Sequence, residues 1–214
     1  MTMAQEKKGI LFIISAPSGT GKTTLVRSLC ARDPNLHISI SHTTRPPRPD
    51  EIQDVSYHFI DDAKFRDMID TNNFLEFAKV FDHHYGTSRD WVEQHLAAGQ
   101  DVVLEIDWQG ATQVRRTLPD TVNIFILPPS FQALEQRLNG RGDNVETVRR
   151  RMHGARIELS HYHEYEYILV NESIDQALLE LETIIRAARH KYTLQKSYYD
   201  DFANLLMEQS GNIE

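Results

Sequence analysis

Cysteine is nearly absent from this chain, since Cys30 is the only one among 214 residues. A single thiol excludes an internal disulfide framework and a zinc site made of cysteines alone. Long apolar runs are missing too, because no stretch approaches the roughly 20 residues that a membrane-spanning helix needs. Residues 1–8 are polar and lack the apolar core of a signal peptide. We therefore expect a cytoplasmic protein with no membrane partner.

A surplus of positive charge is also missing. The chain carries 23 basic and 31 acidic side chains, a net charge of −8. Broad nucleic-acid binding usually requires a basic surplus, so we expect no nucleic-acid partner. A small anionic ligand stays compatible with this charge, because a local arginine cluster dominates the field at short range.

What the sequence does contain is a regular alternation of apolar runs and helical patterns. The run at 10–15 is apolar up to its last residue, which is typical of a strand buried on both faces. A helical pattern follows it at 22–32. Later runs and helical patterns lie at 102–106, 109–117, 123–127, 130–139, 167–170 and 173–191. The order predicts an α/β fold, a three-layer core with a parallel sheet between helices.

Two regions interrupt the alternation. Residues 41–98 begin with a proline-rich turn and contain alternating stretches, which predicts an inserted mixed α+β subdomain. Residues 137–164 begin with an arginine-rich, glycine-punctuated stretch, which predicts a mobile lid leading into a helix. We therefore expect one domain over 9–207, with a core at 9–40, 99–136 and 165–207. The tail from 192 is expected to be helical through Met207.

A phosphate-binding motif lies between the first strand and the first helix. It reads Ala16, Pro17, Ser18, Gly19, Thr20, Gly21, Lys22, Thr23 and Thr24. The two glycines permit positive φ, so that backbone N–H groups can converge on a phosphate. Lys22 can then reach the β- and γ-phosphates of ATP, and Thr23 offers a hydroxyl to Mg²⁺. The usual P-loop pattern begins with glycine, so Ala16 departs from it, and Thr24 is open to an ordinary first-turn role.

Two carboxylates close the apolar run at 102–106. Strand alternation would place Glu105 and Asp107 on the same side. A carboxylate at this position suits Mg²⁺ coordination through a bound water in a P-loop enzyme. The alternative is a solvated strand end or the cap of the next helix.

The proline-rich turn carries two arginines, Arg45 and Arg48, three residues apart. Prolines limit the freedom of the loop, so less entropy is lost when both guanidinium groups converge on an anion. Tyr57 and Tyr85 add hydroxyl donors. A solvated loop explains an Arg-Pro stretch equally well when it is taken alone.

Taken together, these motifs resemble those of guanylate kinases of the bacterial type. The resemblance covers about 9–196, and its most specific stretches are 15–24, 41–48, 74–78, 85–87, 104–110 and 137–142. It implies transfer of the ATP γ-phosphoryl group to GMP, and to dGMP as well, with Mg²⁺. The insertion at 41–98 would bind GMP. A homodimer is left open.

The resemblance also assigns the acceptor residues. The GMP phosphate would be held by Arg45, Arg48, Tyr57 and Tyr85. Guanine would be recognised by Glu76, Ser41 and Thr87, with Asp107 also in the acceptor site. Guanine presents two adjacent donors, which match the two oxygens of a carboxylate, whereas adenine presents an unprotonated N1. Without the family match, Glu76 is an ordinary outward-facing strand residue.

Arginines of the lid are implied to neutralise charge on the transferred phosphoryl group. Arg137 and Arg141 match by position. The third arginine corresponds to Arg151, although a lid one residue shorter leaves Arg149 and Arg150 open. Asn171 matches a position near the adenine of ATP, with a turn cap as the alternative.

The chain departs from the family pattern at Asp50 and Asp54, which replace glycines, and at His83 and His84. Asp tolerates left-handed backbone better than most residues, but the added charges are expected to weaken GMP affinity. Two other functions remain to be tested against guanylate kinase. One is a related kinase acting on another phosphorylated acceptor such as a ribose bisphosphate, and the other is a non-catalytic interaction module.

Overall fold

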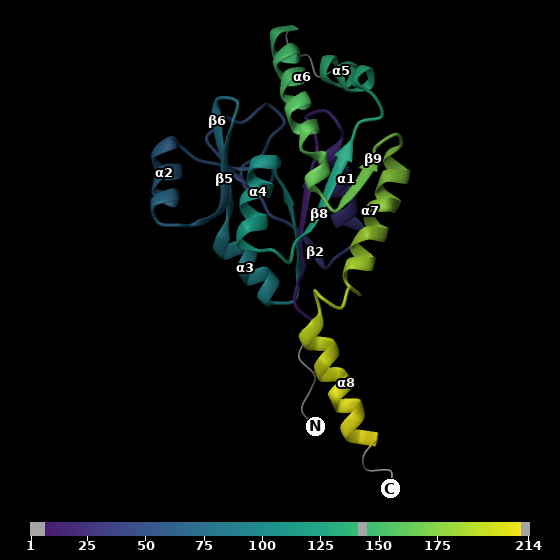
Figure 1. The fold of residues 1–214 in the computed structure, drawn as a ribbon. Helices are drawn as coiled ribbons and strands as arrows, with labels where there is room; N and C mark the ends of the chain where they lie inside the picture. The colour runs from purple at the N-terminus through teal and green to yellow at the C-terminus, as the bar shows by residue number, and fades with distance from the viewer. Residues whose placement is uncertain (1–6, 141–144, 211–214) are drawn as a thin grey trace.

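The computed structural model describes residues 7–140 and 145–210. Its main sheet has the strand order β2-β7-β1-β8-β9, and every neighbouring pair is parallel (Figure 1). The strands are β1 (Leu11–Ser15), β2 (Leu36–Ile38), β7 (Asp101–Glu105), β8 (Val122–Leu127) and β9 (Tyr167–Val170). The predicted α/β fold with a parallel sheet is confirmed.

Helices cover both faces of this sheet. The helices α1 (Lys22–Arg32) and α7 (Ile174–Ala188) pack on one face, whereas α3 (Arg89–Ala97) and α4 (Trp108–Thr117) pack on the other. Side chains alternate along β1, because Phe12 and Ile14 belong to the first hydrophobic cluster and Leu11 and Ile13 to the second. The continuous apolar run in the sequence is therefore the mark of a strand buried between two helical layers.

Strand β1 lies between β7 and β8, so the chain connects from it to both sides of the sheet. Parallel sheets bind ligands outside the carboxyl ends of their strands at such a switch point. The loop 16–21 leaves β1 at this end. The fold thus places the phosphate-binding motif where an α/β sheet offers its binding crevice.

A second sheet lies beside the core, with the order β4-β3-β6-β5 and both parallel and antiparallel pairs (Figure 1). Its strands are β3 (His42–Thr43), β4 (His58–Phe59), β5 (Phe74–Val80) and β6 (His83–Ser88), and the helix α2 (Asp62–Asp70) lies between β4 and β5 in the chain. Phe65, Met68 and Phe74 form its small core. The structure confirms the mixed insertion, and the exact domain limits stay a prediction.

The region after β8 contains α5 (Phe131–Asn139), α6 (Val145–Ser160) and the short 3-10 helix η1 (Tyr162–Glu164). Leu134 and Leu138 of α5 pack on Val148 and Ala155 of α6. Both helices stand at the end of the molecule where β8 ends (Figure 1). Mobility of this lid stays a prediction.

Two segments differ from the sequence-based expectation. Strand β2 was not predicted, because it has three residues and only Leu36 is buried. The helix expected at 173–191 ends at Ala188, and a separate helix α8 (Lys196–Ser210) follows. Buried Gln195 lies at this break, and its side-chain amide donates to the carbonyl of Lys8. Helix α8 projects from the core at the end opposite α6 (Figure 1). Within the described ranges, no helix is long and apolar enough to cross a membrane.

Candidate active site

The loop between β1 and α1 has the backbone shape that phosphate binding requires. Gly19 and Gly21 have φ angles of 92° and 98°, in the left-handed region where glycine has no Cβ penalty. Gly21 is the N-cap of α1 and provides no side-chain cap. The first N–H groups of the helix therefore remain available to an anion.

The remaining loop residues divide into buried and exposed groups. Ala16 is buried and packs in the cluster beneath α1, so the core accommodates its methyl group in place of the usual glycine. Pro17 is buried, and its carbonyl accepts from the N–H of Thr20 at 3.1 Å. Ser18 and Thr24 are exposed. The buried hydroxyl of Thr20 has no hydrogen-bond partner among the described residues.

Lys22, Thr23 and Glu105 meet where α1 begins and β7 ends. The Thr23 hydroxyl donates to Glu105 Oε2 at 2.9 Å, and Lys22 Nζ lies 4.0 Å from the same oxygen. Hydroxyl and carboxylate oxygens are the protein ligands that Mg²⁺ accepts, usually while it keeps several waters. The arrangement therefore fits a Mg²⁺ ion bound beside the phosphates of a nucleotide.

Asp107 lies beyond the end of β7 and is the N-cap of α4. Its Oδ1 accepts from the backbone N–H groups of Gln109 at 3.1 Å and Gly110 at 3.0 Å, and its Oδ2 accepts from the Gln109 side chain. Strand alternation therefore does not align Asp107 with Glu105, because the strand stops first. The helix-cap alternative describes its contacts in this structure.

Arg45 is held in place by three neighbours in the insertion. Its Nε donates to the Tyr85 hydroxyl at 3.1 Å, its Nη2 lies 2.7 Å from Glu51, and its guanidinium stands over the Tyr57 ring at 5.4 Å. The rings of Tyr57 and Tyr85 are 5.8 Å apart. The structure therefore brings together Arg45, Tyr57 and Tyr85, as the resemblance implies for a phosphate site.

Glu51 links the two arginines, and the sequence reasoning did not assign it. Its Oε2 accepts from the Arg48 backbone N–H at 2.8 Å, and its Oε1 lies 3.8 Å from the Arg48 guanidinium, which is 52% exposed. Burial raises the pKa of Glu51, but the bonds from Arg45 and Arg48 outweigh this and hold it below the ordinary value. Glu51 follows Arg48 by three residues, and that spacing is the only signal in the sequence.

Glu76 is a buried carboxylate on β5. It is 4% exposed, and its Oε1 accepts from the Thr87 hydroxyl at 2.6 Å. Burial raises the pKa of Glu76 to about 7, opposed by the Thr87 hydrogen bond and helped by the charge of Asp107. Ser41 precedes β3, and the antiparallel register His42–Gly86 places it level with Thr87. The insertion thus brings the three predicted guanine-recognising residues to one region.

Arg137 and Asn171 meet at the carbonyl of Thr20 in the loop. Arg137 Nη1 donates to that oxygen at 3.0 Å, and the Asn171 side chain donates to it at 2.7 Å. Asn171 is fully buried, and its Oδ1 has no hydrogen-bond partner in the described part of the chain. An unsatisfied acceptor beside the phosphate-binding loop fits a ligand donor such as the adenine amine.

The other lid arginines are placed unequally. Arg141 lies outside the described residues. Arg150 contacts the β5–β6 turn, with an ion pair of 2.8 Å to Asp82 and its guanidinium 4.8 Å from the centre of the Phe81 ring. Arg149 is exposed and Arg151 is half-buried. Arg150 is therefore in contact with the insertion in this structure. The identity of the third lid arginine stays a prediction.

The carboxyl end of α6 reaches back to the start of α4. The His161 ring, which follows α6, stacks on Trp108 at 3.8 Å, next to the Asp107 cap. Glu158, one turn earlier, is half-buried, and burial raises its pKa to about 8, opposed by the nearby Lys22 charge and helped by Asp107. The sequence reasoning did not find Glu158, because nothing local distinguishes it from a solvated helix residue.

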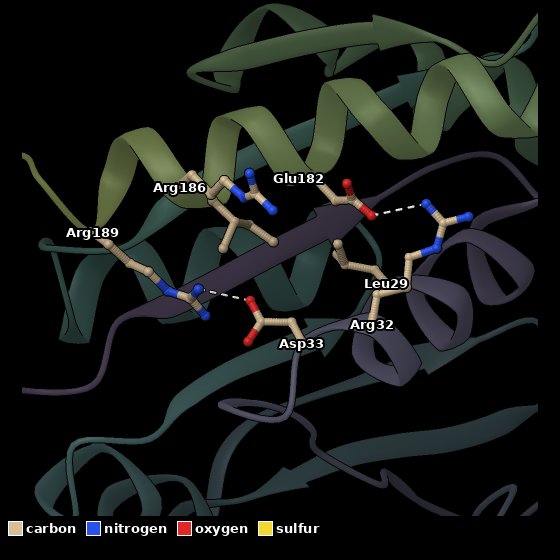
Figure 2. A pocket seen from close by; sticks show the side chains of 7 residues that line it. Leu29, Arg32, Asp33, Glu182, Arg186 and Arg189 are labelled. Atoms are coloured by element: carbon tan, nitrogen blue, oxygen red, sulfur yellow. Dashed lines mark hydrogen bonds and ion pairs between the residues drawn. The ribbon is translucent and has the colours of Figure 1, made fainter.

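A separate pocket lies between α1 and α7, away from the loop (Figure 2). Two ion pairs lie in it, because Arg32 pairs with Glu182 at 3.1 Å and Arg189 pairs with Asp33 at 2.7 Å. Arg32 lies in the last turn of α1 and Arg189 is the C-cap of α7, and both positions carry partial negative charge where arginine is favourable. We interpret this pocket as part of the contact that fastens α7 to α1.

The fold and the loop define a P-loop α/β protein with an inserted second sheet. The sequence model of the guanylate kinase family matches residues 8–188. The chain belongs to the guanylate kinase family.

Individual relatives agree with this assignment. A guanylate kinase of Methylococcus capsulatus is 55% identical over 183 residues, which covers 85% of this chain and 90% of the relative. One from Chromohalobacter salexigens is 47% identical over 215 residues and covers 100% of both chains. The crystal structure of guanylate kinase from Anaplasma phagocytophilum matches with a TM-score of 0.76 at 32% identity, covering 90% of this chain and 92% of that one.

Proposed function

We propose that this chain transfers the γ-phosphoryl group of ATP to GMP, giving ADP and GDP, and that it also accepts dGMP. The observation that carries the acceptor assignment is the buried carboxylate of Glu76 with its hydrogen bond to Thr87. A buried double acceptor is costly unless a ligand donates to it. Guanine offers two adjacent donors at the required spacing, and adenine does not.

Phosphoryl transfer depends on positioning and on neutralising charge, with little covalent participation by the protein. In this proposal the N–H groups of the loop and Lys22 hold the phosphates of ATP. Arg45 and Arg48, oriented by Glu51, hold the phosphate of GMP with the hydroxyl groups of Tyr57 and Tyr85. The acceptor oxygen is on that GMP phosphate, so two anionic groups must approach each other.

Arginines of the lid would neutralise the charge that this approach creates. Arg137 already touches the loop, and Arg141 and Arg151 complete the set in the proposal. Their approach would exclude water and so suppress hydrolysis of ATP. Asn171 would contact the adenine, because its Oδ1 is buried without a partner among the described residues.

Magnesium dependence belongs to the same proposal. Mg²⁺, when bound, would supply positive charge that stabilises the negative charge on the phosphate oxygens. Thr23 and Glu105 are the residues that would hold it, with Glu105 acting through a water. The hydrogen bond between them places the Thr23 hydroxyl and Glu105 Oε2 next to each other, close to Lys22.

The direct test is to incubate the chain with ATP, Mg²⁺ and GMP and to quantify the nucleotides by chromatography. The proposal predicts equal amounts of ADP and GDP and no product when GMP is omitted. ADP without GDP would indicate a nucleotide hydrolase and would contradict it. A cytoplasmic location is part of the proposal, because ATP and GMP are metabolites of that compartment.

We further propose that two copies pair through α8. None of the side chains described at 196–209 is buried, and Phe202 and Leu206 are 44% and 50% exposed. Two such helices from identical chains could bury these groups against each other. Sedimentation at micromolar concentration should show a dimer that the double substitution Phe202→Asp, Leu206→Asp converts to a monomer. A monomeric unsubstituted chain would contradict this.

A further inference from the structure

The face of α4 that packs on β5 carries two residues with contacts that no catalytic role explains. They are Gly110 and Gln113, three residues apart and therefore on the same side of the helix. Strand β5 carries Glu76 and forms the outer edge of the second sheet. The contact joins the core to the strand that bears the buried carboxylate.

Gly110 allows α4 to lie directly against the carboxylate. A Cβ atom at this position would stand 2.5 Å from Glu76 Oε2 and 3.0 Å from its carboxyl carbon. Glycine in a helix costs about 1 kcal/mol relative to alanine, so a close approach is a physical reason for its presence here. The absent side chain leaves the space that the Glu76 carboxylate occupies.

Gln113 binds the backbone of the residue that follows Glu76. Its Nε2 donates to the Phe77 carbonyl at 2.7 Å, and its Oε1 accepts from the Phe77 N–H at 3.2 Å. A primary amide is the side-chain group that offers one donor and one acceptor side by side. Gln113 therefore satisfies the backbone N–H and carbonyl of Phe77, which have no strand partner on this side because β5 is an edge strand.

We propose that Gly110 and Gln113 are positioning residues that set the Glu76 carboxylate for guanine and so determine the preference for GMP over other purine nucleotides. The inference rests on the proposed function, because it assumes that Glu76 binds guanine. Thr87 holds Oε1 of the carboxylate by a hydrogen bond within the sheet. Gly110 leaves room for Oε2 on the side of α4, and Gln113 holds the backbone of Phe77, the next residue. A displacement of about 1 Å in such a group is enough to impair recognition strongly.

Replacing Gln113 by methionine tests the positioning role, because methionine keeps the length of the side chain and removes both hydrogen bonds to Phe77, together with a long one of 3.4 Å to Gln109 of the same helix. The position is partly exposed, so water can solvate the freed Phe77 groups and the fold should survive. The matched control is Gln176→Met on α7, where the amide donates to Glu180 of its own helix. Kinetic constants are measured for ATP, GMP and IMP, since IMP lacks the exocyclic amine of guanine.

The proposal predicts for Gln113→Met a KM for GMP raised about tenfold, from the loss of two hydrogen bonds. The ratio of kcat/KM for GMP to that for IMP should fall several-fold, while the KM for ATP and the control variant stay unchanged. Gly110→Ala should alter the same ratio in the same direction. A purely structural role would lower the melting temperature without changing the nucleotide preference.

The outcomes separate the inference from the function beneath it. If the unsubstituted chain does not phosphorylate GMP, the proposed function itself is contradicted. If it does, and Gln113→Met keeps the KM for GMP and the GMP to IMP ratio of the control, only the positioning role is overturned. Should Gly110→Ala fail to fold, Gln113→Met still decides between these results.

Discussion

The two halves of the candidate site are built in different ways. On the donor side, the loop 16–21 and the start of α1 supply backbone N–H groups, and the two glycine φ angles define their direction. On the acceptor side, side chains from 41–87 hold one another, as in the contacts of Arg45 with Glu51 and of Thr87 with Glu76. A backbone-built site is contained in a short stretch of sequence, whereas a side-chain-built site exists only after folding.

Because the donor side relies on backbone groups and on the side chain of Lys22, the loss of Lys22 is expected to have the largest effect on turnover. Lys22→Ala should lower kcat by roughly a thousandfold or more, because no other described cation lies in the loop to neutralise the ATP phosphates. The melting temperature should change little, since Lys22 interacts weakly: its Nζ lies 4.0 Å from Glu105 Oε2, and it acts on Glu158 through its charge. Lys191→Ala, on the far side of the core, is the control. Near-normal turnover by Lys22→Ala would overturn the P-loop assignment.

On the acceptor side, the largest effect is expected for Glu76→Gln. An amide presents one donor and one acceptor, so one guanine donor loses its partner. The value of kcat/KM for GMP should fall by roughly two to three orders of magnitude, with the KM for ATP unchanged. Steady-state kinetics with varied GMP measure this. An unchanged GMP to AMP preference would remove Glu76 from the recognition site.

Burial raises the pKa of Glu76 to about 7, above the ordinary value of about 4.5, and this makes a separate prediction about stability. The folded state binds this proton more tightly than the unfolded state, so its contribution is complete below about pH 4.5 and is lost as the pH rises through 7. By about pH 8 the ionisation of buried Glu76 lowers the free energy of unfolding by roughly 3 kcal/mol. Glu76→Gln should therefore be more stable than the unsubstituted chain at about pH 8, with the difference vanishing near pH 4. Denaturant unfolding at both pH values measures it, and a difference independent of pH would contradict the burial of a charged Glu76.

A smaller effect is expected for Glu51→Gln, which touches the acceptor site through other residues. The amide keeps the shape but weakens the contacts with Arg45 and Arg48, both of which are held by Glu51. The KM for GMP should rise about tenfold, because a charged hydrogen bond contributes more than a neutral one by about 1–1.5 kcal/mol. The KM for ATP should stay constant, and an equal rise in both would indicate general destabilisation instead.

The smallest effect is expected for Asp54→Gly, which introduces the glycine that the resemblance implies at this position. Asp54 has φ of 63°, and its exposed carboxylate binds His58 Nδ1 at 2.6 Å. Glycine relieves the left-handed backbone by about 1 kcal/mol, but the lost hydrogen bond with His58 offsets part of this. The KM for GMP should fall about twofold at low salt and remain unchanged at about 0.5 M salt, because exposed charges are screened. A higher KM would show that the Asp54–His58 contact supports the site.

Elements with a strong local pattern could be predicted from the sequence, whereas those that depend on distant contacts could not. The core strands were found within one residue of their ends, because a run buried between two helical layers is apolar throughout. Strand β2 was missed, since three residues with one buried side chain leave no pattern. A helical tail through Met207 was expected, and α8 (Lys196–Ser210) agrees with it. The break between α7 and α8 was missed, because it lies at Gln195, whose side chain contacts the distant carbonyl of Lys8.

In the site, Gly19, Gly21 and Lys22 could be assigned from local pattern alone. Glu76 needed the family resemblance, since an isolated Phe-Leu-Glu-Phe stretch favours an outward carboxylate, and its burial arises from the packing of α4. Glu51, Gly110 and Gln113 had no assigned role. Gly110 and Gln113 contact β5, which is distant in sequence, and Glu51 acts through its neighbours Arg45 and Arg48. The cap formed by Asp107 was foreseen as an alternative, and the geometry realises it.

The preference for the acceptor tests the central claim most directly. The chain is incubated with ATP and Mg²⁺ and, in turn, with GMP, AMP, dTMP or a ribose bisphosphate, and ADP formation is followed. The account predicts that GMP supports a kcat/KM at least about a hundredfold above each of the others, because only guanine places two donors on the buried carboxylate of Glu76. Faster ADP formation with AMP, dTMP or the ribose bisphosphate would contradict it.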